Sequence, residues 1–300
     1  MNDSIFSEIL CQPGPLSAVL RAATGILRQA GIDSARLDAE ILVADALSVS
    51  RLELYLQHDR WIQAEELRRI AIRLERRSKF EPVAYIVGCK EFYGLDFHVR
   101  PGVLIPRPET ETIIDAVREW FTPESIFRFA DTCTGSGILG VVLATYFPRS
   151  QGVLIDISDE ALAIARSNVQ LHGLKQRLLA VQGDLLHPTA RNQLDLVVAN
   201  PPYLAPREVE ETMPDVRLHE PRLALEGGDT GCLFLQRLVE QAQRALKPGG
   251  MVCVEMGWQQ EQWVQGQFHG PAWERTAVLK DLAGHDRVVV AHRSKCQRTT

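Results

Sequence analysis

The sequence predicts an α/β protein whose mainly parallel sheet follows a small N-terminal helical bundle and a β-hairpin bridge. Between Phe127 and Arg293, short apolar runs typical of buried strands alternate with helical stretches, which is the pattern of a parallel α/β sheet. Residues 17–79 instead carry helical periodicity alone. At 300 residues the chain is too long for one typical domain. We therefore predict a helical domain at 1–80, a β-hairpin linker at 81–106 and an α/β domain at 107–300.

The composition excludes several protein classes. Hydrophobic residues make up 45% and charged residues 24%, with a net charge of -5, which is typical of a globular protein and not of a general nucleic-acid binder. The six cysteines form no C-x-x-C pair, so we expect neither a metal site nor disulfides, and a reducing cytoplasm fits best. Residues 1–14 lack the bases of a signal peptide, and no apolar run approaches about 18 residues, so neither secretion nor membrane insertion is expected.

The predicted bundle contains three helical segments, at residues 16–32, 35–49 and 64–79. The third brings six cations close together, namely Arg68, Arg69, Arg73, Arg76, Arg77 and Lys79. We interpret them as a solvated helix face, although an acidic partner or RNA could also face them. The bundle is our candidate for partner recognition.

The bridge at 81–106 is rich in β-type residues and turn glycines, which predicts one or two hairpins. Six strands are predicted after it, at 127–133, 152–158, 177–184, 194–200, 249–256 and 287–293. The polar tail at 294–300 is expected to fray.

The first predicted strand of the sheet runs into a glycine-rich turn. Gly135, Gly137 and Gly140 spell G-x-G-x-x-G, which lets a ligand approach the backbone closely. Asp156 ends the next strand, where a carboxylate can accept hydrogen bonds from ribose hydroxyls. A nucleoside ligand is indicated, which leaves a nicotinamide dinucleotide and S-adenosylmethionine both open. Asp184, after the third strand, could either serve the adenine or begin a turn.

Ser158 or Asp159 can cap the helix that follows Asp156, and Gly173 can end it.

The fourth predicted strand ends in Asn200-Pro201-Pro202-Tyr203, at the sheet edge where ligands bind. The Asn200 side-chain oxygen and the Pro201 carbonyl could each accept one N–H of an NH2 group, which would raise the electron density on a poorly nucleophilic nitrogen. The prolines lack N–H donors and hold the carbonyl outward, and Tyr203 offers a face for stacking. This arrangement predicts methyl transfer to a planar amino or amide nitrogen.

The glycine turn, Asp156 and the Asn-Pro-Pro-Tyr loop together resemble the Rossmann-type amino methyltransferases that use S-adenosylmethionine. Within them, residues 81–111, 216–231 and 254–262, as well as the helical N-terminal segment, resemble the release factor glutamine N5-methyltransferases. The resemblance covers nearly the whole chain. It implies methylation of the glutamine in the Gly-Gly-Gln motif of peptide chain release factors.

The resemblance also implies roles for individual residues. It places Asp156 at the ribose, Asp184 and Leu185 at the adenine, and Asn200 beside the cofactor as well as at the substrate. The implied cofactor loop is Cys133, Thr134, Gly135, Ser136 and Gly137, and the implied glutamine clamp is Asn200, Pro201, Pro202 and Tyr203, with catalysis by Asn200, Pro201 and Tyr203.

Two motifs point to different substrates within this resemblance. The family loop usually reads Asp-Leu-Gly-Thr-Gly-Ser-Gly, whereas Cys133 gives this chain the form seen in sister enzymes that methylate a ribosomal-protein glutamine. The longer motif Ile-Pro-Arg-Pro-Glu-Thr-Glu at 105–111 has the release-factor form, and we weigh it more heavily. There Pro108 can open a helix, and Arg107 or Glu109 could lie near the cofactor. Residues 216–228 form a long connection without clear secondary structure, suited to a clamp over the incoming protein.

Three other functions compete with this interpretation. A nicotinamide-dependent oxidoreductase would leave the Asn-Pro-Pro-Tyr loop unexplained. A methyltransferase acting on nucleic-acid bases should carry a broad basic surface, which the net charge does not suggest, so no stable nucleic-acid partner is expected. An RNA- or ribosome-binding module built on the arginine-rich helix would not depend on Asn200.

Overall fold

The computed structural model describes residues 13–295, and these form two compact units. The helical unit comprises the described part of Met1–Gly88 together with Met213–His219, and the sheet unit comprises Cys89–Thr212 and the described part of Glu220–Thr300. The expectations for residues 1–12 and for 296–300 lie outside the described residues. The predicted boundaries at 80 and 106 stay predictions.

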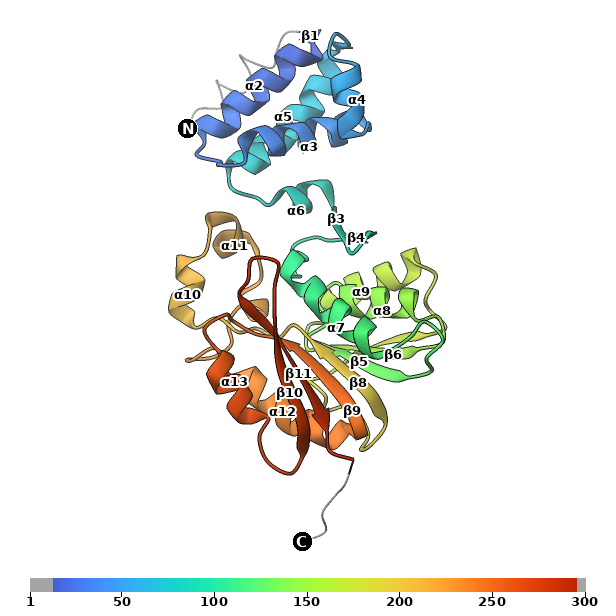
Figure 1. Cartoon of the computed structure of the whole chain (residues 1–300). Helices are drawn as coiled ribbons and strands as arrows, with labels where there is room; N and C mark the ends of the chain where they lie inside the picture. Colours follow the sequence, from blue (N-terminus) through green and yellow to red (C-terminus); the bar gives the residue numbers. More distant parts are fainter. Residues whose placement is uncertain (1–12, 296–300) are drawn as a thin grey trace. The chain divides into compact units, whose positions relative to one another are not determined.

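The helical unit is built from amphipathic helices (Figure 1). Leu16, Val19, Ala23, Ile26 and Leu27 form the buried face of α2, at the three- and four-residue spacing of a helix. The helices of this unit are α2 (Leu16–Gln29), α3 (Ala35–Leu47), α4 (Arg51–Leu56), α5 (Ala64–Ser78), α6 (Val83–Val87) and α11 (Pro214–His219), with a short pair of strands, β1 (Gly14–Pro15) and β2 (Trp61–Ile62). The prediction of β structure at Val83–Val87 is wrong, because Pro82 opens a helical turn there and Gly88 ends it in the left-handed conformation.

The cations of α5 are largely paired within the helical unit. Arg77 is buried, and it donates to Asp38 at 2.7 Å and to Asp215 of α11 at 3.4 Å. Ion pairs also join Arg73 to Asp45, Arg76 to Glu81, Arg68 to Glu65 and Lys79 to Glu75. Most cations of the arginine-rich helix therefore pair with acidic residues of the same unit, which the helical pattern did not predict.

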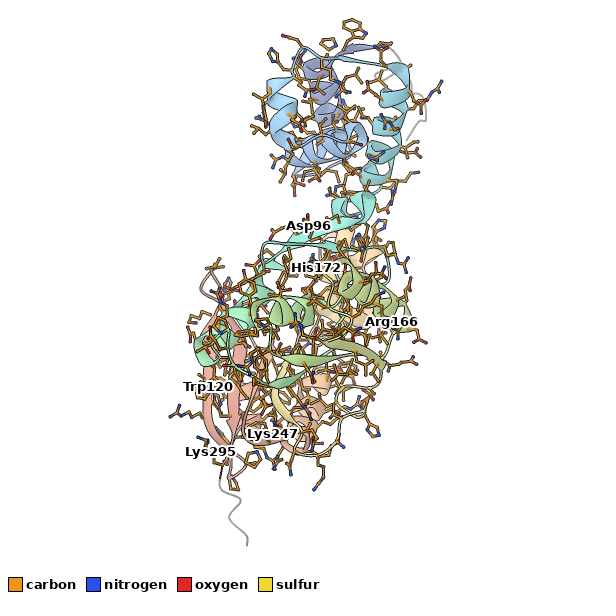
Figure 2. All side chains as sticks on the ribbon, turned by 90° about the vertical axis from the view of Figure 1, so that its right-hand side faces the viewer. Asp96, Trp120, Arg166, His172, Lys247 and Lys295 are labelled. Carbon is orange, nitrogen blue, oxygen red and sulfur yellow. The ribbon has the colours of Figure 1, made fainter. Side chains whose placement is uncertain are left out.

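A single hairpin opens the sheet unit, from β3 (Cys89–Phe92) and β4 (Leu95–His98). Tyr93 and Gly94 both have positive φ, as a two-residue type I′ turn requires. Figure 2 shows His172, at the end of α9, beside Asp96 of β4, and the His172 Nε2 atom lies 2.9 Å from the Asp96 carbonyl oxygen. The hairpin is thus tied to the body of the sheet unit.

The seven-stranded sheet has the order β10-β11-β9-β8-β5-β6-β7. Its strands are β5 (Arg128–Thr132), β6 (Gln151–Asp156), β7 (Leu178–Gln182), β8 (Leu194–Ala199), β9 (Leu246–Glu255), β10 (Trp273–Lys280) and β11 (Asp286–Arg293). The five strands β5 to β9 run parallel to one another, and β11 pairs antiparallel with both β9 and β10. The six predicted strands and the α/β fold are confirmed. The edge strand β10 was missed because most of its residues are polar or exposed.

Both faces of the sheet are covered by helices (Figure 1). Along β8, Leu196 and Val198 join the core that contains α7 and α8, whereas Val197 and Ala199 join the core that contains α12 and α13. The remaining elements are η1 (Pro108–Thr110), α7 (Glu111–Trp120), α8 (Ile138–Tyr146), α9 (Asp159–Leu171), α10 (Pro206–Glu211), η2 (Arg222–Ala224), α12 (Leu233–Ala245) and α13 (Glu261–Gln267). Because both faces are apolar, polar groups of these strands gather where the strands end.

Several local predictions can be checked directly. Ser158 caps α9 by accepting a hydrogen bond from the Ala161 N–H, and Gly173, with φ 70°, follows the end of that helix. Pro108 opens η1 as predicted. The prediction that 216–228 lacks secondary structure is wrong, because α11 and η2 both lie partly or wholly within it.

Candidate active site

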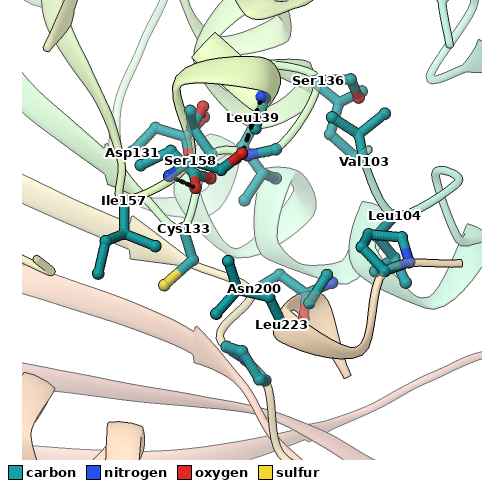
Figure 3. A pocket seen from close by; sticks show the side chains of 18 of the residues that line it. Val103, Leu104, Asp131, Cys133, Ser136, Leu139, Ile157, Ser158, Asn200 and Leu223 are labelled. Atoms are coloured by element: carbon teal, nitrogen blue, oxygen red, sulfur yellow. Dashed lines mark hydrogen bonds between the residues drawn. The ribbon is translucent and has the colours of Figure 1, made fainter. Parts of the chain in front are cut away.

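A cavity of about 280 Å³ lies at the carboxyl ends of the parallel strands (Figure 3). Its position is the one expected for an open α/β sheet, where the strand order reverses on either side of β5. The predicted site residues that line it are Cys133, Thr134, Gly135, Ser136, Asp156, Asp184, Leu185, Asn200 and Pro202. Gly137, Pro201 and Tyr203 lie outside the lining.

The turn after β5 is fixed by hydrogen bonds to its neighbours. The Thr134 N–H donates to the Ile155 carbonyl at 3.1 Å, and the Gly135 N–H donates to Asp156 Oδ2 at 2.9 Å. Gly137 has φ 85°, and a Cβ there would lie 3.3 Å from the Cβ of Ala165, so a side chain would be strained by the backbone conformation and tightly packed. Although Gly137 does not line the cavity, it lets α8 start directly beside it.

Asp131 is a functional candidate that the sequence did not predict. It is 1% exposed, and its Oδ2 atom accepts hydrogen bonds from the Thr134 hydroxyl at 2.6 Å and the Gly140 N–H at 2.9 Å. Its Oδ1 atom is buried and has no partner among the described residues. Burial raises the pKa of Asp131 to about 7, against the opposing effect of these two hydrogen bonds.

A buried acceptor without a partner at a cavity wall suits a ligand that brings its own donor. Asp131 lines the cavity and its Oδ1 atom is buried without a partner among the described residues, which suits a cationic group such as the ammonium of S-adenosylmethionine. Asp156, on the same wall, accepts from the Gly135 N–H and, at 3.0 Å, from the Ser158 N–H. Burial raises the pKa of Asp156, and these backbone donors oppose that shift. The two carboxyl groups, as hydrogen-bond acceptors, therefore fit a nucleoside that carries an ammonium group.

Asp184 and Leu185 follow β7 on the wall of the cavity. Asp184 forms an ion pair with Arg237, and its carbonyl accepts a turn hydrogen bond from the His187 N–H at 3.1 Å. Leu185 is buried and has φ 52°, a conformation that is uncommon for a residue with a side chain. Asp184 thus begins a turn and also lines the cavity, while Leu185 supplies an apolar surface.

Asn200 follows the last residue of β8 and lines the cavity. Its Nδ2 atom donates to the Thr110 hydroxyl oxygen at 3.0 Å. The adjoining loop is held by three further bonds: Leu204 N–H to the Leu225 carbonyl, Gly227 N–H to the Leu204 carbonyl, and Gln260 Nε2 to the Tyr203 carbonyl. The Pro201 carbonyl oxygen has no hydrogen-bond partner among residues 13–295. Two acceptors, the Asn200 and Pro201 oxygens, are therefore left on a rigid loop.

Gly231 shows how closely this loop is packed. It has φ 73°, and a Cβ there would lie 2.3 Å from the Tyr203 carbonyl oxygen. Any side chain would displace the loop.

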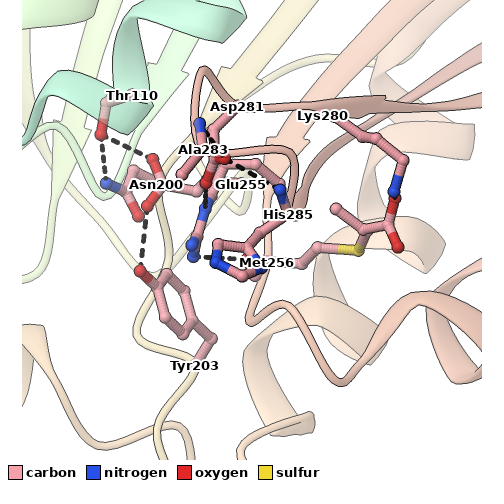
Figure 4. Close-up of polar contacts among 11 residues, drawn as sticks. Thr110, Asn200, Tyr203, Glu255, Met256, Lys280, Asp281, Ala283 and His285 are labelled. Atoms are coloured by element: carbon pink, nitrogen blue, oxygen red, sulfur yellow. Dashed lines mark hydrogen bonds and ion pairs between the residues drawn. The ribbon is translucent and has the colours of Figure 1, made fainter.

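Behind the loop lies a buried polar network (Figure 4). Glu255, 1% exposed at the end of β9, accepts the Thr110 hydroxyl at 2.6 Å and the Tyr203 hydroxyl at 3.0 Å. Burial raises the pKa of Glu255 and of Tyr203. The sequence analysis missed Thr110 and Glu255, and it did not foresee that the Tyr203 hydroxyl is already engaged.

Arg107 and Glu220 form an ion pair beside the cavity. Glu220 accepts from the Arg107 guanidinium at 2.5 Å and from the Ile105 N–H at 3.0 Å. Arg107 lines the cavity, whereas Glu109 does not. The buried Glu220 carboxylate thus fixes residues 105–107 against the segment that leads into η2.

Two further observations bear on the class of site. Within residues 13–295, no cluster of three or more His, Cys, Asp and Glu side chains is arranged to hold a metal ion. No helix in this part of the chain is long and apolar enough to cross a membrane.

The chain is similar to known proteins along most of its length. Residues 18–88 match the family described as PrmC N-terminal domain, and residues 119–228 match the Methyltransferase small domain. A release factor glutamine methyltransferase from Caulobacter vibrioides is 40% identical over 270 residues, which cover 90% of this chain and 93% of the relative. Another from Nitratidesulfovibrio vulgaris is 39% identical over 285 residues, or 94% of this chain and 96% of the relative.

Solved structures support the fold. The hMettl16 catalytic domain has a TM-score of 0.56 at 14% identity, over 77% of this chain and 83% of that one. A methyltransferase from Pyrococcus furiosus has a TM-score of 0.50 at 16% identity, over 68% of this chain and 92% of that one. At these identities the likeness concerns the fold alone.

Proposed function

This chain belongs to the release factor glutamine methyltransferase family, and we propose that it methylates the side-chain amide nitrogen (N5) of the glutamine in the Gly-Gly-Gln motif of peptide chain release factors. It is an enzyme, and its cofactor is S-adenosylmethionine. The observation that carries the proposal is the place of Asn200, which lines the cavity at the carboxyl ends of the strands and has its amide nitrogen already bound to Thr110.

In the proposed complex, S-adenosylmethionine supplies an electrophilic methyl group. Asp131 holds the ammonium of the cofactor through Oδ1, Asp156 faces the ribose, and Asp184 and Leu185 lie at the adenine. The backbone of Cys133, Thr134, Gly135, Ser136 and Gly137 lets the cofactor approach closely.

The glutamine amide is a poor nucleophile because its nitrogen lone pair is delocalised into the carbonyl. The Asn200 Oδ1 atom and the Pro201 carbonyl each accept one of its N–H groups, which aligns the nitrogen and favours electron density on it. Pro202 stiffens the loop, and the Tyr203 ring, fixed through its hydroxyl, forms a wall beside the amide. Positioning supplies most of the rate, and the proton leaves after the methyl group has transferred.

Transfer of labelled methyl from S-adenosylmethionine to a purified release factor, with the modified residue mapped by mass spectrometry, tests the proposal. We expect label on the Gly-Gly-Gln glutamine, none on a release factor that carries glutamate there, and loss of label in Asn200→Ala. The exposed amide variant Gln176→Ala is the matched control and should behave as wild type. Label on another residue of the release factor would contradict the proposal.

A ribosomal-protein glutamine is the second candidate substrate, because Cys133 gives the cofactor loop the form seen in the sister enzymes. The same assay with isolated ribosomal proteins in place of the release factor separates the two. Exclusive labelling of a ribosomal protein would favour this alternative.

We further propose that the helical unit recognises the protein partner and that the enzyme works in the cytoplasm without a stable nucleic-acid partner. The free thiols of Cys89, Cys133, Cys232 and Cys253 support a reducing compartment. The ion pairs of α5 speak against a nucleic-acid surface on that helix. A folded variant without the helical unit that still methylates full-length release factor at the wild-type rate would contradict the recognition role.

A further inference from the structure

We propose that Glu255 is a positioning residue that acts through Thr110 to present the oxygen, and not the nitrogen, of the Asn200 amide to the substrate. The inference rests on the proposed function, since it concerns how the substrate amide is held.

The three residues come from separate parts of the sheet unit. Ala199 of β8 pairs with Val254 of β9, so Asn200 and Glu255 are the next residues at adjacent strand ends. Thr110, the last residue of η1, lies between their side chains (Figure 4). It is fully buried and bonded to both, at 3.0 Å to Asn200 Nδ2 and 2.6 Å to Glu255 Oε2.

The polarity of this chain follows from what each group can donate. The Thr110 hydroxyl donates to Glu255 Oε2 at 2.6 Å, and an ionised carboxylate, which only accepts hydrogen bonds, holds the single hydroxyl proton of Thr110 in that direction. The Thr110 oxygen can then only accept from its other neighbour, and only the NH2 end of the Asn200 amide can donate to it. The Asn200 Oδ1 atom is left for the substrate and has no hydrogen-bond partner among the described residues.

Without the carboxylate, this choice would be lost. A threonine hydroxyl both donates and accepts, so it could bind either end of an asparagine amide. The reversed amide would present N–H groups to the N–H groups of the substrate glutamine. Such a site would lose its attraction for an amide nitrogen and gain attraction for a carboxylate.

The second Glu255 oxygen accepts the Tyr203 hydroxyl, so the carboxylate is saturated from two sides. Burial raises the Glu255 pKa, and the two hydroxyl donors and the nearby Arg287 oppose the rise, while Glu109 adds to it. Glutamine cannot replace this carboxylate without a penalty. If its NH2 end faces Thr110, the direction of the hydrogen bonds from Glu255 to Asn200 is reversed. If its NH2 end faces Tyr203, the phenol proton of Tyr203 loses its acceptor.

The test uses four variants of the full chain: Thr110→Val, Thr110→Ser, Glu255→Gln and the exposed control Thr145→Val. Two quantities are measured for each. The first is kcat for release-factor methylation at saturating S-adenosylmethionine. The second is the affinity ratio for release factors that carry glutamine or glutamate in the Gly-Gly-Gln motif, with S-adenosylhomocysteine bound so that no transfer occurs.

We expect Thr110→Val and Glu255→Gln to lower kcat about tenfold and to lower the glutamine-over-glutamate ratio by a similar factor, the worth of about one hydrogen bond. Affinity for S-adenosylmethionine should stay within about twofold in Glu255→Gln, since Glu255 does not line the cavity, whereas Thr110 does. Thr110→Ser, which keeps the hydroxyl, should restore most of the rate and of the ratio.

A lower rate with an unchanged ratio would overturn the inference, because a purely structural role would not alter amide preference. A wild-type rate in Thr110→Val would overturn it as well. Because Thr110→Val retains the buried Glu255 carboxylate, it still tests the inference if Glu255→Gln fails to fold. If the wild-type enzyme itself does not label the Gly-Gly-Gln glutamine, the proposed function fails. If wild type labels it but all variants keep the wild-type ratio, only this inference fails.

Discussion

Asp131, inside β5, and Glu255, the last residue of β9, are both buried carboxyl groups at 1% exposure, yet their surroundings differ. Asp131 keeps one oxygen without a partner among residues 13–295, whereas both oxygens of Glu255 accept hydrogen bonds from hydroxyl groups of the protein. An unsatisfied buried acceptor suits a ligand, and a saturated one orients its neighbours. The difference supports the proposed roles, in which Asp131 binds the cofactor and Glu255 places the substrate clamp.

The largest effect is expected from Asn200→Ala, which removes the group that Glu255 orients. Loss of an oriented polar group at the reacting atom costs about 100-fold or more in kcat. Affinity for S-adenosylmethionine, measured by calorimetry, should change by less than about tenfold, because the Asp131 side of the site is untouched. A variant that keeps kcat but loses cofactor affinity would place Asn200 on the cofactor side only.

Asp131→Asn should weaken S-adenosylmethionine binding about 10- to 100-fold, since a charge-assisted hydrogen bond contributes about 1.5–3 kcal/mol. At saturating cofactor the rate should recover most of the wild-type value. The exposed Asp59→Asn is the matched control and should bind normally. An unchanged Kd would show that the free oxygen of Asp131 does not meet the cofactor.

A smaller effect is expected from pH. Because burial raises the Asp131 pKa to about 7, the carboxylate of the free enzyme is ionised above pH 7 and becomes neutral below it. Cofactor affinity should therefore fall as the pH drops from about 8 to 6, by up to about tenfold for each pH unit below the pKa. Binding titrations should show this slope in wild type and lose it in Asp131→Asn; a flat wild-type profile would contradict the role of Asp131.

The smallest effect concerns Cys133, two residues after Asp131. Its φ of 56° is a conformation that costs a residue with a side chain about 1–2 kcal/mol, and the resembling family usually has glycine there. Cys133→Gly would remove this conformational cost, but the greater freedom of glycine in the unfolded chain offsets part of the stabilisation. The substitution should therefore raise the free energy of unfolding by at most about 1 kcal/mol. Urea unfolding measures it. Cys89→Gly in β3 should instead destabilise, and equal losses in both variants would contradict the account.

The same two carboxylates show how far the sequence predicts the site. The glycine turn, Asp156 and Asn200 were predictable because each belongs to a local pattern at the end of an apolar run. Asp131 was missed because an acid inside a strand has no local signature, and its free oxygen depends on how Thr134 and Gly140 fold back on it. Glu255 meets Thr110 across 145 positions of sequence, a contact that only the strand order creates.

Fold prediction failed where local and tertiary preferences disagree. The six predicted strands are continuous apolar runs covered on both faces. The missed strand β10 lies at the sheet edge, where only one side pairs and where exposed Glu274 and Arg275 interrupt the apolar pattern. In residues 83–87 the β-type residues form α6, because Pro82 and Gly88 set the ends of a helical turn.

The most direct test of these two separate roles compares Asp131→Asn with Glu255→Gln. For each variant it measures the Kd for S-adenosylmethionine and the kcat on a release factor. The account predicts that Asp131→Asn raises Kd about 10- to 100-fold with a much smaller change in kcat at saturation. It predicts that Glu255→Gln lowers kcat about tenfold and leaves Kd within about twofold. If both variants changed Kd and kcat in the same proportion, the two carboxylates would serve one function and the account would be wrong.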